Sequence, residues 1–589
     1  VASDQHSCGG VNWPLFGNIS ISDVTMETPY TEAANKITDD IDVCDVAGIF
    51  EKLKQCDFEM FEPKGYGDVK TLFHDDVIEA ISKVANIAAD IMTSQTPNAI
   101  VISGCGTSGR VAFLTARSLN KIVPGEKFRY TIAGGDKALF TSQEAPEDNR
   151  KAGVNDLIKS TIDDVKVLYI GITCGLSAPY VAGQLDYCMD NLDKFVPVII
   201  GFNPVYLARK NPIYDWDKTF YDVVTRLERL TSQRKGFLIN PVLGGEAITG
   251  SSRMKGGSIT MVILQTIFTH ALNGVLTSSD MTSQLECKNL LKSYQNTCRL
   301  FYESSTTTVT TLMTSATQSL KSNSSVYYVS SGGSGVLGIV DSTECIPTYG
   351  ASLDDVRGFI VGGYGEFNNA EGDIGSLGKN YQIGCDDLSK LLKLRDLEHN
   401  DTILVVAKSW DDPVLNEIQV EKGKKKLKLS ASQSNVYVVV IDTEQGKREK
   451  NMPDYVAKLF VISIDLNEEL LSENLIEICS KWIFNAVSTG AHVLIGKVFR
   501  NYMVDLKVSN QKLFHRSIGI IQRFCPSVSE QEAMTYLLKS IHDVTNVDDV
   551  MHRSIKDHVL RATPKDKVLT TYCLSAVLRC STSPKQARM

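Results

Sequence analysis

The chain has 589 residues, of which 43% are hydrophobic and 22% are charged, and its formal net charge at pH 7 is −8. A chain of this length is expected to hold several domains with large apolar cores. The acidic balance argues against nucleic acid as the main partner, because nucleic acid attracts basic surfaces. The one dense basic run, residues 422–428, is more typical of a solvated loop than of a binding or import signal.

The cysteines and histidines give no sign of a disulfide framework or a metal centre. The fourteen cysteines show no Cys-x-x-Cys pairing, and the nine histidines show no metal-ligand spacing. We therefore expect reduced thiols in a cytosolic or nuclear protein, with no metal and no cofactor. The most apolar predicted helix, residues 258–276, is interrupted by polar side chains, which favours a buried helix over a membrane span. The start of the sequence shows no signal peptide, although the chain begins without Met.

The most informative segment is residues 103–110, Ser-Gly-Cys-Gly-Thr-Ser-Gly-Arg. An apolar strand is predicted before it and a helix after it, so backbone N–H groups and the positive end of the helix dipole point at one small volume. Gly106 allows close backbone approach there, and Thr107 and Ser108 add hydroxyl donors. We expect a phosphate site, with a purely structural strand-to-helix turn as the alternative.

This segment lacks the marks of a nucleotide site. No Gly-Lys-Ser/Thr sequence closes it, as a Walker A loop requires. Its glycines do match the pattern G-x-G-x-x-G, but no clear acidic residue ends a second strand about 20 residues further on. A compact phosphate is therefore favoured over a dinucleotide.

A second loop of the same kind follows the apolar strand predicted at residues 167–172. Its sequence is Thr-Cys-Gly-Leu-Ser-Ala-Pro, residues 173–179, with a proline near the start of the next helix. Ligands of open parallel sheets bind at the carboxyl ends of the strands, where both loops are expected to lie. We expect one phosphate to be held by both loops, which makes a purely structural role less favoured.

The predicted elements describe a duplicated α/β chain with a helical end. Strands alternate with helices from residue 99 to residue 201, and the alternation restarts at residue 326 with another apolar strand, Gly/Ser loop and helix. Long helices are expected at residues 251–276 and 282–319, and helical periodicity continues from residue 473 to the end. The predicted strands of the two units are residues 99–102, 128–132, 167–172 and 196–201, then 326–329, 359–361, 402–407, 436–441 and 459–464. The later predicted helices are residues 480–498, 510–523, 530–542 and 568–579.

Further motifs resemble known families. The two loops are similar to those of the sugar isomerase (SIS) domain. Gly134-Gly135-Asp136 with residues 144–148, together with residues 246–257 and 501–506, resemble signature regions of the N-acetylmuramic acid 6-phosphate etherases. The tandem units, the helical cap and residues 487–497 resemble the glucokinase regulatory protein family across nearly the whole chain.

This resemblance implies a fold and a function. The fold is α/β, with two tandem SIS domains (flavodoxin-like, parallel sheet, αβα) and an all-helical cap. The domains expected are an N-terminal arm (1–45), a first SIS domain with preceding helices (46–285), a second SIS domain (286–498) and the cap or lid (499–589). The implied function is a non-catalytic inhibitor of glucokinase, found in nucleus and cytoplasm, whose complex fructose 6-phosphate favours and fructose 1-phosphate opposes. We expect a monomer that forms an internal pseudo-dimer, without a nucleic acid or membrane partner.

The family's fructose-phosphate positions carry over onto matching residues. Those of the loops are Gly106, Thr107, Ser108, Thr173, Cys174, Gly175 and Ser177. Glu147 and Glu344 are implied acceptors for sugar hydroxyls, the second from the second unit, and Lys497 is an implied cation. For Arg253, structural pairing and ligand contact are equally open. The surface at Asp193 and Lys194 is the implied contact for glucokinase.

A lyase or isomerase is the rival hypothesis, because Glu147 matches a carboxylate that the etherases use as a general acid. Against it, the etherase sequence Ser-Gly-Arg-Thr in the second loop is replaced here by Gly-Leu-Ser-Ala, residues 175–178. Etherases also pair two single-domain chains, whereas this chain carries a covalent second unit with a divergent loop. We therefore expect binding without turnover, and one pocket at the junction of the two units and the cap.

Overall fold

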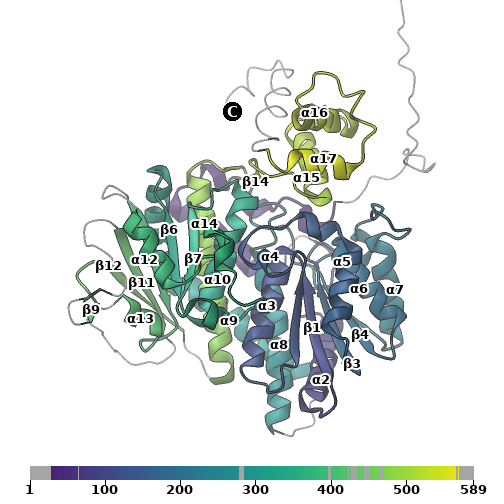
Figure 1. The fold of residues 1–589 in the computed structure, drawn as a ribbon, viewed down its shortest axis with the longest axis horizontal. Helices are drawn as coiled ribbons and strands as arrows, with labels where there is room; N and C mark the ends of the chain where they lie inside the picture. Colours follow the sequence, from purple (N-terminus) through teal and green to yellow (C-terminus); the bar gives the residue numbers. More distant parts are fainter. Residues whose placement is uncertain are drawn as a thin grey trace, which may run out of the picture.

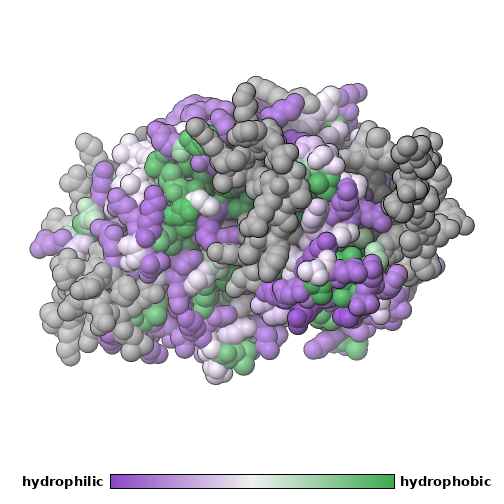
Figure 2. Space-filling model, turned by 90° about the horizontal axis from the view of Figure 1, so that it is seen from above, coloured by the Kyte–Doolittle hydropathy of each residue, from purple (hydrophilic) through white to green (hydrophobic). Residues whose placement is uncertain are grey.

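A computed structural model describes residues 28–63, 66–277, 284–394, 400–418, 420–421, 424–425, 434–442, 452–464, 469–565 and 568. Two α/β units lie side by side, and a small helical cap lies above them near the junction (Figure 1). Most of the expected N-terminal arm, the helix expected at 568–579 and most of the basic run at 422–428 lie outside the described residues. Figure 2 views the molecule from the cap side, where hydrophilic residues cover most of the coloured surface between smaller hydrophobic areas.

The segment before the first sheet is helical, as expected. Three 3₁₀ turns come first, and Asp45 then begins the first long helix by accepting the backbone N–H of Gly48. The side chain of Asn35, 1% exposed, donates to Glu59 at 2.7 Å and to the carbonyl of Gly245 at 2.8 Å. The start of the described chain is therefore held against the first unit by buried hydrogen bonds. These elements are η1 (Tyr30–Glu32), η2 (Lys36–Thr38), η3 (Ile41–Val43), α1 (Val46–Glu59) and α2 (Asp75–Thr93).

The first unit is built on a five-stranded parallel sheet in the order β2-β1-β3-β4-β5. Its central strands are almost wholly apolar because helices cover both faces. Ile100 and Ile102 pack with α2, α3 and α8, whereas Val101 and Tyr169 pack with α6 and α7 on the other face. The strands are β1 (Asn98–Gly104), β2 (Phe128–Ile132), β3 (Lys166–Ile172), β4 (Phe195–Ile200) and β5 (Phe237–Ile239), and the helices are α3 (Gly106–Asn120), α4 (Lys137–Phe140), η4 (Ala145–Asp148), α5 (Arg150–Ser160), α6 (Pro179–Asp190), η5 (Val205–Leu207), α7 (Phe220–Ser232) and α8 (Lys255–Thr277).

The second unit repeats this topology. Its parallel sheet has the order β12-β11-β8-β6-β7, so in both units the strands follow the order second, first, third, fourth, fifth. This flavodoxin-like order confirms the predicted α/β fold and the internal duplication. The strands are β6 (Val326–Ser330), β7 (Val356–Ile360), β8 (Asp401–Ala407), β11 (Ser434–Asp442) and β12 (Val456–Ser463), with a hairpin of β9 (Val420–Glu421) and β10 (Lys424–Lys425). The helices are α9 (Gln284–Lys321), α10 (Gly332–Tyr349), α11 (Gly363–Phe367), η6 (Gly375–Leu377), η7 (Lys379–Tyr381), α12 (Cys385–Leu394), α13 (Pro413–Glu417) and α14 (Glu469–Leu494).

Of the two long helices that follow, the first is buried as predicted and the second ends earlier than predicted. Among the described residues, α8 is the one helix long and apolar enough to cross a membrane, but 89% of its apolar window is buried inside the protein. It serves as a core helix between α2 and α9. The helix predicted to reach residue 498 ends instead at Leu494 in α14, because Gly496 adopts a φ of +77° that interrupts a helix.

In its described part, up to residue 568, the cap has a short hairpin and three helices. The hairpin is β13 (Val498–Phe499) with β14 (Tyr502–Met503), and the helices are α15 (Gln511–Phe524), α16 (Glu530–His542) and α17 (Ile555–Ala562). Asn510, Ser529 and Ser554 cap the three helices with side-chain oxygens. The predicted helices at 510–523 and 530–542 are confirmed to within one residue.

Candidate sugar-phosphate site

The first loop joins β1 to α3 and brings two hydroxyl groups to the amino end of that helix. Gly106 begins α3 with a φ of +49°, a backbone conformation that favours glycine. Gly109 is also required, because a Cβ atom there would lie 2.5 Å from Cγ1 of Ile132. Thr107 and Ser108 are 7% and 9% exposed. The loop thus has the strand–turn–helix geometry that suits an anion.

The second loop lies against the first. The Oγ of Ser108 is 3.8 Å from the Sγ of Cys174. The hydroxyl oxygen of Thr173 accepts the backbone N–H groups of Ser177 and Ala178 at 3.2 and 3.4 Å, so this side chain shapes its own loop. Burial raises the pKa of the Cys174 thiol to about 11, which keeps it protonated at neutral pH.

The amino end of α8 adjoins both loops. A Cβ atom on Gly256 would lie 3.1 Å from the Sγ of Cys174, and one on Gly257 would lie 3.1 Å from the Cγ2 of Thr107. The buried carboxylate of Glu246 accepts the backbone N–H groups of Lys255 and Gly256, both at 2.9 Å. The predicted signature at 246–257 therefore packs against the two loops and holds this helix end in place.

The cap supplies a lysine that sequence reasoning missed. The ammonium of Lys512, in the first turn of α15, donates to both carboxylate oxygens of Glu147 at 3.0 Å. Burial opposes the charge, but Glu147 and Glu144 raise the pKa of Lys512 above its ordinary value. The backbone N–H of Gln511 donates to Asp148 at 2.9 Å. The acidic η4 segment thus contacts the positive end of α15. The sequence signal for this helix start was Asn510, a residue type that commonly caps helices.

Two arginines that sequence reasoning also missed, Arg209 and Arg516, interact electrostatically with Glu147 and Glu32. Arg516 on α15 makes a two-point contact with Glu32, at 2.9 Å from Nε and 2.6 Å from Nη2. Arg209 follows η5, and its backbone N–H donates to the carbonyl of Leu176 in the second loop at 3.1 Å. Burial lowers the pKa of Arg209, with nearby Arg516 acting in the same direction, against the carboxylates of Glu147 and Glu32.

The second unit reaches the first loop through Glu344. This residue lies on α10, and a Cβ atom on Gly106 would be 3.7 Å from its Oε1. Its carboxylate forms an ion pair with Arg110 of α3. Burial raises the pKa of the Cys105 thiol in the first loop, with Glu147 acting in the same direction and Lys512 against it, so Glu147 and Lys512 lie near this loop. Parts of both units and of the cap therefore meet around the two loops.

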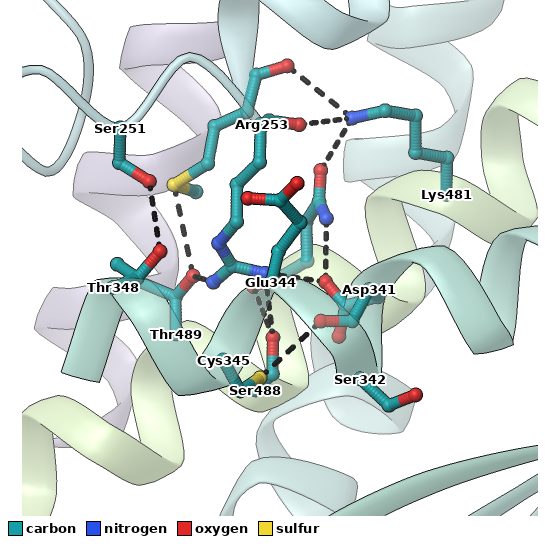
Figure 3. A network of polar contacts seen from close by, with 12 residues as sticks. Ser251, Arg253, Asp341, Ser342, Glu344, Cys345, Thr348, Lys481, Ser488 and Thr489 are labelled. Atoms are coloured by element: carbon teal, nitrogen blue, oxygen red, sulfur yellow. Dashed lines mark hydrogen bonds and ion pairs between the residues drawn. The ribbon is translucent and has the colours of Figure 1, made fainter. Parts of the chain in front are cut away.

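Arg253 has a different environment. It is 2% exposed, and its terminal nitrogens donate to Asp341 at 2.5 Å, Tyr349 at 2.8 Å and Thr489 at 2.7 Å. Figure 3 shows the contacts with Asp341 and Thr489 converging on the guanidinium. Both terminal nitrogens are thus taken up by the second unit, which favours the structural pairing left open above.

Lys497 lies beyond the end of α14, and its side chain turns toward the cap. Its ammonium is 3.1 Å from the carboxylate of Asp505. The helix predicted to include it ends before it, at Leu494. A ligand contact by Lys497 stays a prediction, and Lys512 is the cation that the structure brings to Glu147.

Comparison with known proteins identifies the family. The model of the glucokinase regulatory protein N-terminal SIS domain matches residues 79–189, that of its second SIS domain matches residues 303–495, and that of its C-terminal lid domain matches residues 500–589. The glucokinase regulatory protein of Xenopus laevis is 35% identical over 98% of this chain and 94% of its own length. The chain belongs to the glucokinase regulatory protein family. The human protein of the same name is 34% identical over 98% of this chain and 93% of its own.

A more distant relative covers part of this chain. The N-acetylmuramic acid 6-phosphate etherase of Staphylococcus epidermidis is 30% identical over 40% of this chain and 74% of its own length. The likeness to the etherases predicted from the motifs is thus confirmed for part of the chain.

The second SIS unit keeps the backbone of the phosphate loop but fills it. Gly332 has a φ of +53°, matching Gly106, and a Cβ on Gly335 would collide with β7 as one on Gly109 would with β2. At Gly333, however, where the first unit has Thr107, a Cβ would collide with the carboxylate of Glu477 from α14. The corresponding loop of the second unit, between β6 and α10, is therefore closed by an acidic side chain of the protein itself.

The surface expected to contact glucokinase lies at the amino ends of the strands of the first SIS sheet, opposite the ends that carry the phosphate loops. Asp193 and Lys194 come between α6 and the first residue of β4, whereas the phosphate loops follow the last residues of β1 and β3. Asp193 is exposed, and the ammonium of Lys194 donates to the carbonyl of Thr161 at 2.5 Å. A contact there would be separated from the ligand loops by the length of the strands.

Proposed function

We propose that this chain binds fructose phosphates between its two SIS units and its cap and, in response to them, inhibits glucokinase. Fructose 6-phosphate favours and fructose 1-phosphate opposes the inhibitory complex. The observation that supports this most is the meeting of Lys512 from the cap, Glu147 from the first unit and Glu344 from the second around one phosphate-type loop. The names of the relatives support glucokinase as the partner.

The geometry supports a role for each group. The phosphate lies at the amino end of α3, where backbone N–H groups, Thr107 and Ser108 donate hydrogen bonds. Glu147 and Glu344 accept from sugar hydroxyls. Each charge-assisted hydrogen bond contributes roughly 1.5–3 kcal/mol.

Carboxylates of the protein itself contact the positive groups of the proposed site. Lys512 is neutralised by Glu147, and the amino end of α15 by Asp148. An arriving phosphate competes with these carboxylates for the same positive groups, so ligand binding changes how the cap is held. A ligand shifts an equilibrium between two arrangements only by its difference in affinity for them. Two fructose phosphates that contact Lys512 differently therefore differ in the arrangement of the cap that they favour.

Binding without turnover is favoured over the lyase alternative. A general acid must hold a proton within reach of the leaving group. Both carboxylate oxygens of Glu147 instead accept bonds from Lys512, and the second loop lacks the etherase sequence. We expect no lactate from N-acetylmuramic acid 6-phosphate and no isomerised sugar from fructose 6-phosphate.

The test is inhibition of glucokinase by the full chain, with and without each fructose phosphate, alongside calorimetry of the ligands. The variant Lys512→Met is expected to bind fructose 6-phosphate about 10- to 150-fold more weakly, the equivalent of one lost charge-assisted bond. Lys539→Met, on α16 of the same cap, is the control and is expected to bind as the wild type does. Product formation would refute the non-catalytic assignment, and wild-type affinity in Lys512→Met would refute the placement of the ligand.

A further inference from the structure

Helix α10 of the second unit carries two acidic side chains on one face, and each meets an arginine of the first unit. Asp341 and Glu344 are three residues apart, which places them on neighbouring turns of the same face. Asp341 pairs with Arg253 and Glu344 pairs with Arg110. Figure 3 draws contacts from Asp341 to the Arg253 network and none to the Glu344 carboxylate. The two acidic residues therefore have separate partners.

Arg110 is held rigidly by the first unit. Its side chain is 1% exposed, its Nε donates to the carbonyl of Ala138 at 2.8 Å, and its Nη2 donates to the carbonyl of Thr141 at 3.0 Å. These carbonyls belong to α4 and the residue that follows it. Because a guanidinium is planar, fixing two of its nitrogens also fixes the third, Nη1, which donates to Glu344.

Glu344 retains capacity to bind a ligand. Its Oε1 is engaged by Arg110 and lies beside Gly106, and its side chain is 14% exposed. An ionised carboxylate has about four acceptor sites over its two oxygens. The contact with Arg110 uses one of them, so sites remain for a hydroxyl group of a sugar whose phosphate occupies the first loop.

We propose that Arg110 is a positioning residue for sugar recognition: it aims the Glu344 carboxylate of the second unit at the sugar hydroxyls of a phosphate-bound ligand. This inference rests on the proposed function, since it takes the ligand to be a fructose phosphate in the first loop. Arg110 does not itself touch the phosphate. Its effect is on the sugar, through Glu344, and it makes recognition of the sugar depend on how the two units are placed.

The alternative is an ion pair that only joins the units, and the chain offers a matched control for it. Arg117 lies on the same helix, is 5% exposed, and pairs across the units with Glu366, while its Nε donates to the carbonyl of Phe367 at 2.9 Å. It thus resembles Arg110 in burial and in joining the two units, but its partner is not at the first loop.

The experiment measures, by calorimetry on the full chain, the affinity for fructose 6-phosphate and for inorganic phosphate. We compare Arg110→Met, Glu344→Gln, the double variant and Arg117→Met. Arg110→Met and Glu344→Gln are each expected to weaken fructose 6-phosphate about 10- to 50-fold and to leave inorganic phosphate within about twofold of the wild type. Because the two residues act as one unit, the double variant is expected to lose no more than the larger single loss. Arg117→Met is expected to bind both ligands as the wild type does.

Several outcomes would overturn the inference. They are an equal loss of phosphate and fructose 6-phosphate affinity in Arg110→Met, additive losses in the double variant, or the same loss in Arg117→Met. If Arg110→Met does not fold, Glu344→Gln and the conservative Arg110→Lys decide, and unchanged fructose 6-phosphate affinity in both would refute it. Failure of the wild type to bind fructose 6-phosphate would instead refute the proposed function.

Discussion

Glu477, which closes the loop of the second unit, is expected to make the stability of this protein depend on pH. The residue is 6% exposed and accepts a hydrogen bond from the amide of Gln265 at 3.2 Å. Burial, with the neighbouring carboxylate of Glu473, raises its pKa from 4.5 to about 7, against the lowering effect of Arg117 and Lys408. The substitution Glu477→Gln keeps the shape of the side chain and removes its titration.

The sign follows from comparing the folded and unfolded chains. The folded pKa lies above the value of an exposed carboxyl group, so the folded protein binds this proton more tightly. The resulting stability is complete below about pH 4.5 and is lost as the pH rises through about 7. At about 1.4 kcal/mol per pKa unit, the wild type loses about 3 kcal/mol through this group and Glu477→Gln loses none of it. This corresponds to roughly 6–12 °C in the midpoint for unfolding of a unit of this size.

The assay is thermal unfolding of the wild type and of Glu477→Gln from pH 4.5 to pH 8.5. The two proteins are expected to have similar midpoints at pH 4.5, and the variant to become the more stable one as the pH rises past 7. Glu303→Gln, an exposed position on α9, is the control and is expected to follow the wild type. Parallel curves for wild type and Glu477→Gln, or a variant that loses stability at high pH, would refute the reasoning.

Two further predictions concern buried groups near the ligand loops. Arg253→Met leaves Asp341 buried without its guanidinium partner, so urea unfolding is expected to show a loss of stability of about 3–5 kcal/mol. The double variant with Asp341→Asn is expected to recover a good part of this loss. An unchanged unfolding midpoint in Arg253→Met would contradict the structural role. With a pKa of about 11 and 9% exposure, Cys174 has a thiolate fraction of roughly 0.03% at pH 7.5, so a thiol reagent is expected to leave it unmodified in the folded protein and modify it in urea. Modification of folded Cys174 as fast as a free thiol would show that the loops are more open than described.

Most strands of the two units could be predicted from the sequence because they are apolar runs, and the central ones are buried on both faces. The three-residue strand β5 could not, since Phe237–Ile239 is too short to show a pattern. The two loops could be recognised because all their functional groups are local in the sequence. Lys512 could not, because it meets Glu147 across 365 residues and no local pattern reports such a pairing. Lys497 was implied in its place by the resemblance of residues 487–497 to the family.

The closed loop of the second unit has a consequence for how this protein could have arisen. In an assembly of two identical chains, any substitution appears in both copies, so an acidic side chain that fills one loop would fill the other as well. Joining the two units in one chain removes that constraint. Here the loop of the first unit keeps Thr107, whereas in the loop of the second unit Gly333 takes its place and Glu477 fills the space. Covalent fusion thus allows the second unit to lose its own site while it still contributes Glu344 to the site of the first unit.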